Sequence, residues 1–153
     1  MLRLSEEVYH GRSLSSVGIA AHEAGHAIQD AVGYLPLAIR NFAVLAASFG
    51  SSAGMLLLML GVLLNFKALL LLGIVLFSAV VFFQVINLPV EFNASRRAKL
   101  LLQETGIVGP HEMGPVNNVL NAAALTYVAA TLQSVLWLLY YVLRFTSGQR
   151  AAR

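Results

Sequence analysis

The sequence contains the five residues His22-Glu23-Ala24-Gly25-His26, which match the pattern H-E-x-x-H. On a helix, histidines four positions apart lie on one face, one turn apart, so both imidazoles can bind a single zinc ion. The glutamate beside the first histidine can then accept a proton from the attacking water. The alternative is a surface helix with two incidental histidines. The motif predicts a metal-dependent hydrolytic site with His22 and His26 as ligands and Glu23 as catalytic base.

The chain of 153 residues is 58% hydrophobic and 11% charged, whereas about 25% of an ordinary soluble domain is charged. No charged residue occurs for 26 positions between Arg40 and Lys67, or for 23 positions between Lys67 and Glu91. A third uncharged stretch separates Glu112 from Arg144. Because about 20 apolar residues cross a bilayer as a helix, we expect an all-α integral membrane protein with three transmembrane helices. The predicted spans are 39–65, 68–90 and 122–143.

Composition also excludes several kinds of site. The chain has no cysteine, so any metal must be bound by histidine or carboxylate side chains, and disulfides are excluded. The formal net charge is only +3, and the basic residues mostly flank the predicted spans. They are therefore interpreted as topology signals and not as a nucleic-acid surface. No cleavable signal peptide is visible in the first 36 residues.

Residues 1–36 form the predicted catalytic segment ahead of the first span. Leu2-Arg3-Leu4 alternates like a short strand. Ser13 or Ser15 is expected to begin the helix that carries H-E-x-x-H, and Gly33 is expected to end it. Because this helix mixes charged, polar and small apolar side chains, we expect it to lie at the membrane surface.

A zinc site needs a third protein ligand besides two histidines. The first two spans are expected to form a hairpin, which returns the segment 91–121 to the side of the H-E-x-x-H helix. Glu91 ends an apolar run, where a carboxylate needs a partner; it is a candidate ligand or, alternatively, an interfacial carboxylate neutralised by Arg96 or Arg97. His111, in a loop between Gly-Pro pairs, is the other candidate.

Two further expectations concern topology. Pro89 can start or kink a helix at the membrane boundary, so a separate short helix is expected after the second span. The side of the predicted site carries Arg3, Arg12, Arg40, Arg96, Arg97 and Lys99, and the opposite side carries Lys67, Arg144, Arg150 and Arg153. The excess of basic residues on the side of the predicted site favours a cytoplasmic site under the positive-inside rule.

Hydrolysis of a peptide bond also needs a donor to the oxyanion. Tyr127, His111 and Arg96 are candidates that the sequence does not rank. Tyr127 enters the third span near Asn121 and Thr126, where hydrogen bonds between helices are an equal alternative to catalysis.

Four features together resemble a known family. They are the His-Glu-Ala-Gly-His motif, the apolar hairpin after it, and the segments 87–98 (NLPVEFNASRRA) and 121–130 (NAAALTYVAA). From Leu2 to about Leu143 the chain resembles the zinc-dependent neutral membrane metallopeptidase family of the bacterial YugP type. The Glu-x-x-Ala-Ser stretch that begins at Glu91 is also similar to the Glu-x-x-Ala-Asp element of HtpX-like membrane proteases.

The resemblance implies a zinc metalloendopeptidase of the gluzincin kind in a bacterial plasma membrane, in contact with lipid and acting on proteins or peptides. It implies one zinc ion bound by His22, His26 and Glu91. Where the HtpX-like element has an aspartate that braces a ligand histidine, this chain has Ser95, so a corresponding role would use its hydroxyl. The resemblance implies neither an oligomeric state nor a particular substrate.

Members of this family usually carry a further N-terminal transmembrane helix and a short soluble segment ahead of the region matched here. In gluzincins an extended strand before the H-E-x-x-H helix commonly aligns the substrate, and we expect only its tail, Met1 to Ser5, in this sequence. A truncated or inactive zinc-binding membrane scaffold is therefore the alternative function. A site-2 type intramembrane protease is disfavoured because the motif precedes the first span. A desaturase would need more than the four histidines present.

Overall fold

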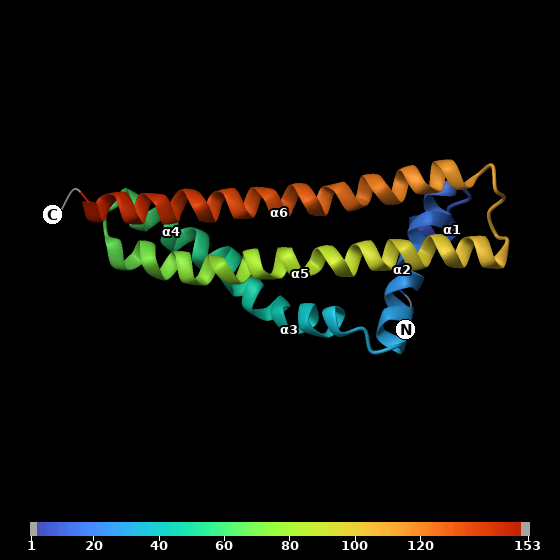
Figure 1. Ribbon diagram of the computed structural model, residues 1–153, viewed down its shortest axis with the longest axis horizontal. Helices are drawn as coiled ribbons and strands as arrows, with labels where there is room; N and C mark the ends of the chain where they lie inside the picture. Colours follow the sequence, from blue (N-terminus) through green and yellow to red (C-terminus); the bar gives the residue numbers. More distant parts are fainter. Residues whose placement is uncertain (1–2, 151–153) are drawn as a thin grey trace. The chain divides into compact units, whose positions relative to one another are not determined.

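The structure is a computed structural model that describes residues 3–150. Its elements are α1 (Glu6–His10), α2 (Leu14–Ala31), α3 (Leu35–Phe49), the π-helical turn η1 (Gly50–Gly54), α4 (Met55–Leu63), α5 (Lys67–Thr105) and α6 (Met113–Arg150) (Figure 1). The chain divides into two compact units, which are described separately. Of the described residues, the first unit comprises 3–38 and 87–128, and the second comprises 39–86 and 129–150.

Three helical stretches are long and apolar enough to cross a membrane, which confirms the predicted number of candidate spans. They are Leu35–Leu63, Lys67–Thr105 and Met113–Ser147. The first two stretches are joined at Leu64–Phe66, where Asn65 has a φ of 49°. Asparagine tolerates this left-handed conformation better than most residues do, so it suits the turn of the predicted hairpin.

The strand predicted from Leu2-Arg3-Leu4 is wrong within the described residues. Arg3 and Leu4 have no regular secondary structure, and Leu2 lies outside the described residues. Between residues 3 and 150 no other segment is a strand, so Arg3 and Leu4 have no partner strand for their backbone hydrogen bonds. The alternating pattern alone could not supply that partner.

The separate short helix predicted after the second span is also wrong, because α5 continues through Pro89 as one helix. An interior proline removes a helical hydrogen bond and costs about 3 kcal/mol. Packing just beyond Pro89 offsets this cost, since Val90, Ala94 and Ala98 are completely buried. The predicted short helix is therefore the C-terminal part of α5.

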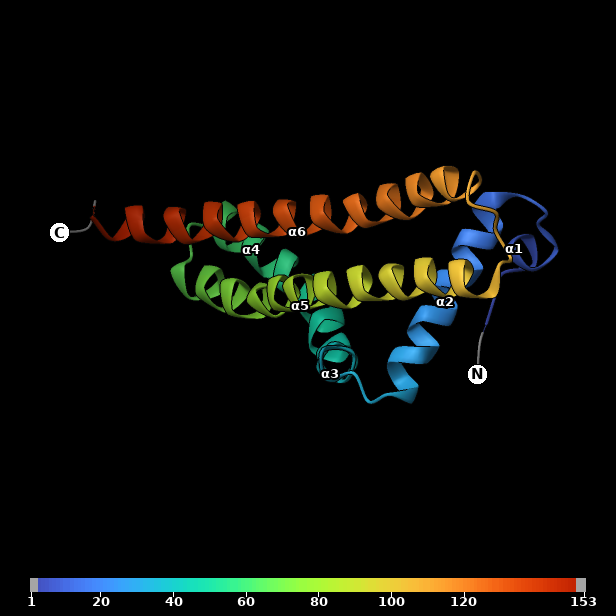
Figure 2. The same ribbon diagram turned by 45° about the vertical axis from the view of Figure 1, so that its right-hand side comes forward.

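The first unit places α2 against the C-terminal part of α5 (Figure 2). Its apolar core consists of Ala21, Ala98, Leu102, Val108, Met113, Val116 and Leu120. The side chain of Ser13 caps α2 by accepting from the backbone N–H of Ser16 at 3.1 Å. Gly33 follows the end of α2 with a φ of 64°, as expected for a helix C-terminus. The predicted limits of the H-E-x-x-H helix are confirmed.

Gly25 allows the backbones of α2 and α5 to approach closely. A Cβ atom at this position would overlap the backbone carbonyl of Ala94 on α5. Ala94 lies between Glu91 and Ser95 in sequence. The separation between the histidines of α2 and the side chains of α5 therefore depends on the missing methyl group of Gly25.

Gly25→Ala is expected to lower the free energy of unfolding by about 1–3 kcal/mol, because the added methyl forces the two helices apart. Thermal unfolding in detergent, together with zinc content, measures this effect. Gly18→Ala on the same helix is the matched control, since its Cβ would lie 3.5 Å from Val116 Cγ1, an ordinary contact. The control is expected to be neutral or stabilising by up to about 1 kcal/mol. Equal effects of the two substitutions would contradict this role of Gly25.

The second unit packs α4 against the N-terminal part of α5. Its buried cluster consists of Leu58, Leu70, Phe77 and Tyr141. Gly50 and Gly54, in η1, face the backbone of α5 at Leu76 and Phe77. These glycines, four positions apart, allow the two helices to pack closely.

Candidate metal centre

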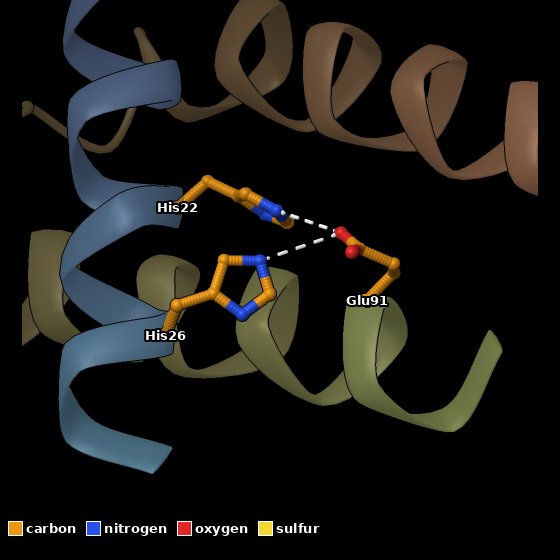
Figure 3. A group of neighbouring side chains, drawn as sticks. All are labelled: His22, His26 and Glu91. Carbon is orange, nitrogen blue, oxygen red and sulfur yellow. Dashed lines mark hydrogen bonds and ion pairs between the residues drawn. The ribbon is translucent and has the colours of Figure 1, made fainter. Parts of the chain in front are cut away.

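Three side chains that can bind a metal converge in the first unit, two from α2 and one from α5 (Figure 3). Glu91 Oε2 lies 3.0 Å from His22 Nε2 and 3.5 Å from His26 Nε2. One ligand atom from each of the three residues lies within 4.8 Å of the other two. Two imidazole nitrogens and one carboxylate oxygen are a donor set that suits zinc.

Glu91 is paired with the histidines and not with a neighbouring arginine. Its side chain is only 7% exposed, and its ion pairs in the described chain are with His22 and His26. The Nε of Arg97 instead donates to Asn93 Oδ1 at 2.8 Å. The pKa of His26 is raised from its ordinary value, chiefly because Glu91 accepts a hydrogen bond from the imidazole. Burial opposes this shift, and the hydrogen bond to Gln29 adds to it. The carboxylate thus stabilises positive charge at the point where a divalent cation would be bound.

The nitrogen of His22 that faces away from Glu91 has a partner on α5. His22 Nδ1 lies 3.1 Å from Ser95 Oγ, one turn beyond Glu91 on the same helix. A hydroxyl can accept a hydrogen bond from the Nδ1–H group. In that arrangement the neutral imidazole has its lone pair on Nε2, which faces Glu91.

Gln29 orients the other histidine, His26, and the direction of each hydrogen bond can be assigned. The amide nitrogen of Gln29 donates to the carbonyl of Val90 at 2.8 Å, and this carbonyl can only accept. Gln29 Oε1 therefore faces His26 Nδ1, at 2.9 Å. Because the amide oxygen accepts, Nδ1 must carry the proton, and the neutral His26 has its lone pair on Nε2.

The same directional argument extends to the arginine. Arg97 can only donate, so the oxygen of Asn93 faces it. That oxygen also accepts from Gln29 Nε2 at 3.0 Å, which is a second reason for the orientation of the Gln29 amide. Arg97, Asn93 and Gln29 thus form a chain of hydrogen bonds that ends at His26. Gln29 is completely buried, so its polar atoms depend on these partners.

The place of Gln29 beside the histidines was not predicted from the sequence. A signal was present: His22, His26 and Gln29 occur at i, i+4 and i+7, the spacing of one helical face. The sequence around Gln29 did not identify Asn93 and Arg97 as its hydrogen-bonding partners, because they lie on another helix.

Gln29→Leu is expected to lower zinc affinity roughly 10–100-fold, the range typical for the loss of an outer partner of a metal-binding histidine. Leucine fills a similar volume but leaves the Nδ1–H of His26 and the carbonyl of Val90 without their partner. Titration with a zinc-buffered indicator measures the affinity. Asp30→Asn, at the neighbouring exposed position, is the control and should bind zinc as wild type does. Wild-type affinity in Gln29→Leu would show that the hydrogen bond does not orient His26 for metal.

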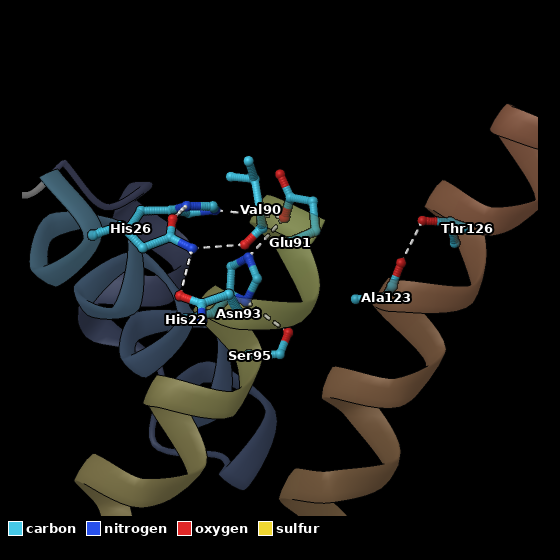
Figure 4. A network of polar contacts seen from close by, with 9 residues as sticks. His22, His26, Val90, Glu91, Asn93, Ser95, Ala123 and Thr126 are labelled. Carbon is cyan, nitrogen blue, oxygen red and sulfur yellow. Dashed lines mark hydrogen bonds and ion pairs between the residues drawn. The ribbon is translucent and has the colours of Figure 1, made fainter. Parts of the chain in front are cut away.

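The remaining predicted residues are not among the three converging side chains. Glu23 is half-buried on α2, and its charge contributes to the raised pKa of His26. His111 is exposed in the loop between α5 and α6 and is not in the group of converging ligands. Tyr127 is half-buried on α6. Nearby, Thr126 donates to the carbonyl of Ala123 on its own helix at 2.6 Å (Figure 4).

Comparison with known proteins agrees with this donor set. The sequence profile of the family described as "Putative neutral zinc metallopeptidase" matches residues 1–146. The chain belongs to this family. Membership of this metallopeptidase family confirms the predicted resemblance. It implies zinc, a metal that the two histidines and the glutamate could bind. No solved structure matches the chain.

The chain is also similar to a protein of Bacillus subtilis (strain 168) described as "Putative membrane protease YugP". The two sequences are 49% identical over 149 residues, which cover 97% of this chain and 66% of that protein. The chain therefore spans slightly less than two thirds of this relative's length. Its family and its three candidate membrane-spanning helices agree with the description of the relative as a membrane protein.

Proposed function

We propose that the chain is a membrane-embedded zinc metalloendopeptidase with its site at the cytoplasmic face of a bacterial plasma membrane. One zinc ion would be held by His22, His26 and Glu91, and Glu23 would act as general base. The observation that supports this most directly is the convergence of the three ligand atoms within 4.8 Å. The partners of both Nδ1 atoms support it further, because they leave each Nε2 to bind the metal.

The bound zinc ion would lower the pKa of a water molecule and polarise the scissile carbonyl. Glu23 accepts the proton of the attacking water and delivers it to the amine that leaves when the peptide bond breaks. Ser95 and Gln29 keep the two imidazoles in one orientation while this occurs. A donor to the oxyanion completes the site; Tyr127, His111 and Arg96 are its candidates.

The test uses the full chain purified in detergent. We expect about one zinc ion per chain, measured by elemental analysis, and cleavage of an unstructured protein such as casein. A chelator should abolish cleavage, and added zinc should restore it. Full zinc content without cleavage would favour the alternative function, an inactive zinc-binding membrane scaffold.

A further inference from the structure

A groove with a volume of about 330 Å³, lined by both polar and apolar side chains, opens between α5 and α6 in the first unit. Its lining includes Phe92, Ser95, Arg96, Lys99, Asn117 and Asn121. Arginine, lysine and side-chain amides contribute to the wall, and none of the lining residues is acidic. The groove is therefore positively charged and rich in hydrogen-bond donors, which are the features that recognise a carboxylate.

The position of Lys99 in this wall is set by a contact between the two helices. Its Nζ donates to Asn121 Oδ1 at 2.9 Å, from α5 to α6. An ammonium group has three donors, so two can serve a ligand or water in the groove. Arg96 is exposed, and its guanidinium can bind a carboxylate through two parallel hydrogen bonds.

The groove lies next to the candidate metal centre and shares Ser95 with it. Phe92 follows Glu91 in sequence, and Ser95 contacts His22 Nδ1 at 3.1 Å while also lining the groove. At about 1.5 Å of rise per residue, Arg96 and Lys99 lie roughly 7 and 12 Å along α5 from Glu91. An extended peptide covers these distances in about two to four residues.

We propose that this groove is a specificity subsite that binds an acidic side chain of the substrate, about two to four residues from the scissile bond. The proposal rests on the proposed peptidase function. A peptide is favoured over an anionic lipid headgroup because Ser95, which contacts the candidate ligand His22, also lines the groove. Side-chain amides in the wall also match the donors and acceptors of a peptide backbone.

The experiment compares two fluorogenic peptides that differ only by Glu or Gln at the positions two to four residues on either side of the cleaved bond. Wild type should favour the Glu peptide in kcat/KM by about tenfold or more, as expected for a charge-assisted hydrogen bond. In Arg96→Gln and Lys99→Gln this ratio should fall toward one. Arg12→Gln, an exposed cation outside the groove, is the control and should keep the wild-type ratio.

An unchanged ratio in both groove variants, or no preference in wild type, would overturn the subsite while leaving the peptidase function intact. Zinc content and thermal unfolding establish that each variant is folded. If the variants keep peptide selectivity but bind short-chain phosphatidylglycerol more weakly in micelles, the groove is a lipid headgroup site and the proposal is wrong.

A measurement of peptide binding without cleavage tests the subsite independently of the proposed peptidase activity. Fluorescence anisotropy with zinc-loaded Glu23→Gln measures the affinity of the same two peptides without cleavage. Tighter binding of the Glu peptide, abolished by adding Lys99→Gln, would support the subsite even if wild type cleaves neither peptide. Equal affinities for the two peptides would overturn it.

Discussion

Glu23→Gln is expected to lower kcat/KM for peptide cleavage by roughly 10²–10⁴-fold, the usual contribution of general acid–base catalysis, while zinc content stays at the wild-type level. Glutamine has the same shape as glutamate but cannot accept the proton of the attacking water. Glu23 is not one of the three residues whose ligand atoms converge, so metal binding does not require its charge. Cleavage of a fluorogenic peptide and elemental analysis on the same preparation measure both quantities.

Glu7→Gln, on exposed α1, is the control for the loss of one negative charge and should remain active. Wild-type activity in Glu23→Gln would contradict the proposed mechanism. A parallel loss of zinc and activity would instead indicate that Glu23 supports the metal site, and the assignment of the general base would be wrong.

Glu91→Ala should lower zinc affinity by more than about 100-fold, beyond the effect typical of removing an outer partner. The substitution removes one of the three proposed protein ligands, the carboxylate that both imidazoles face. Binding that favours the folded state stabilises it by about 2.7 kcal/mol at a free ligand concentration 100 times Kd. The zinc-dependent rise in the unfolding temperature of wild type should therefore be absent from Glu91→Ala.

Glu104→Ala is the matched control on α5, because Glu104 is exposed and lies outside the ligand group. It should bind zinc with wild-type affinity. His111→Ala tests the other ligand candidate and is also expected to bind zinc normally. Normal zinc binding by Glu91→Ala, combined with loss in His111→Ala, would move the third ligand to the loop between α5 and α6.

Local patterns in the sequence were sufficient for several parts of the structure. The spacing of His22 and His26 specified one helical face, since an α-helix repeats every 3.6 residues. Ser13 and Gly33 marked the ends of that helix through backbone groups close in sequence. The long uncharged stretches indicated three membrane-spanning helices because a bilayer demands a minimum apolar length.

Interactions between distant segments were harder to predict. Pro89 indicated a helix boundary, yet burial of the residues after it keeps α5 continuous. The alternation at Leu2 to Leu4 indicated a strand, but a strand requires a partner that the described chain does not contain. In the first case packing outweighed the local preference. In the second, the local preference lacked the partner strand that it requires.

The candidate metal centre shows the same division. The sequence by itself determined that two histidines lie one helical turn apart with a glutamate beside the first. The expected hairpin limited the third ligand to Glu91 or His111. Only the tertiary structure brought Glu91 Oε2 to 3.0 Å from His22 and joined His26 through Gln29 to Asn93 and Arg97. The physical reason is that helix periodicity acts over a few residues, whereas the approach of α2 to α5 depends on the bare backbone at Gly25 and the small, buried Ala94.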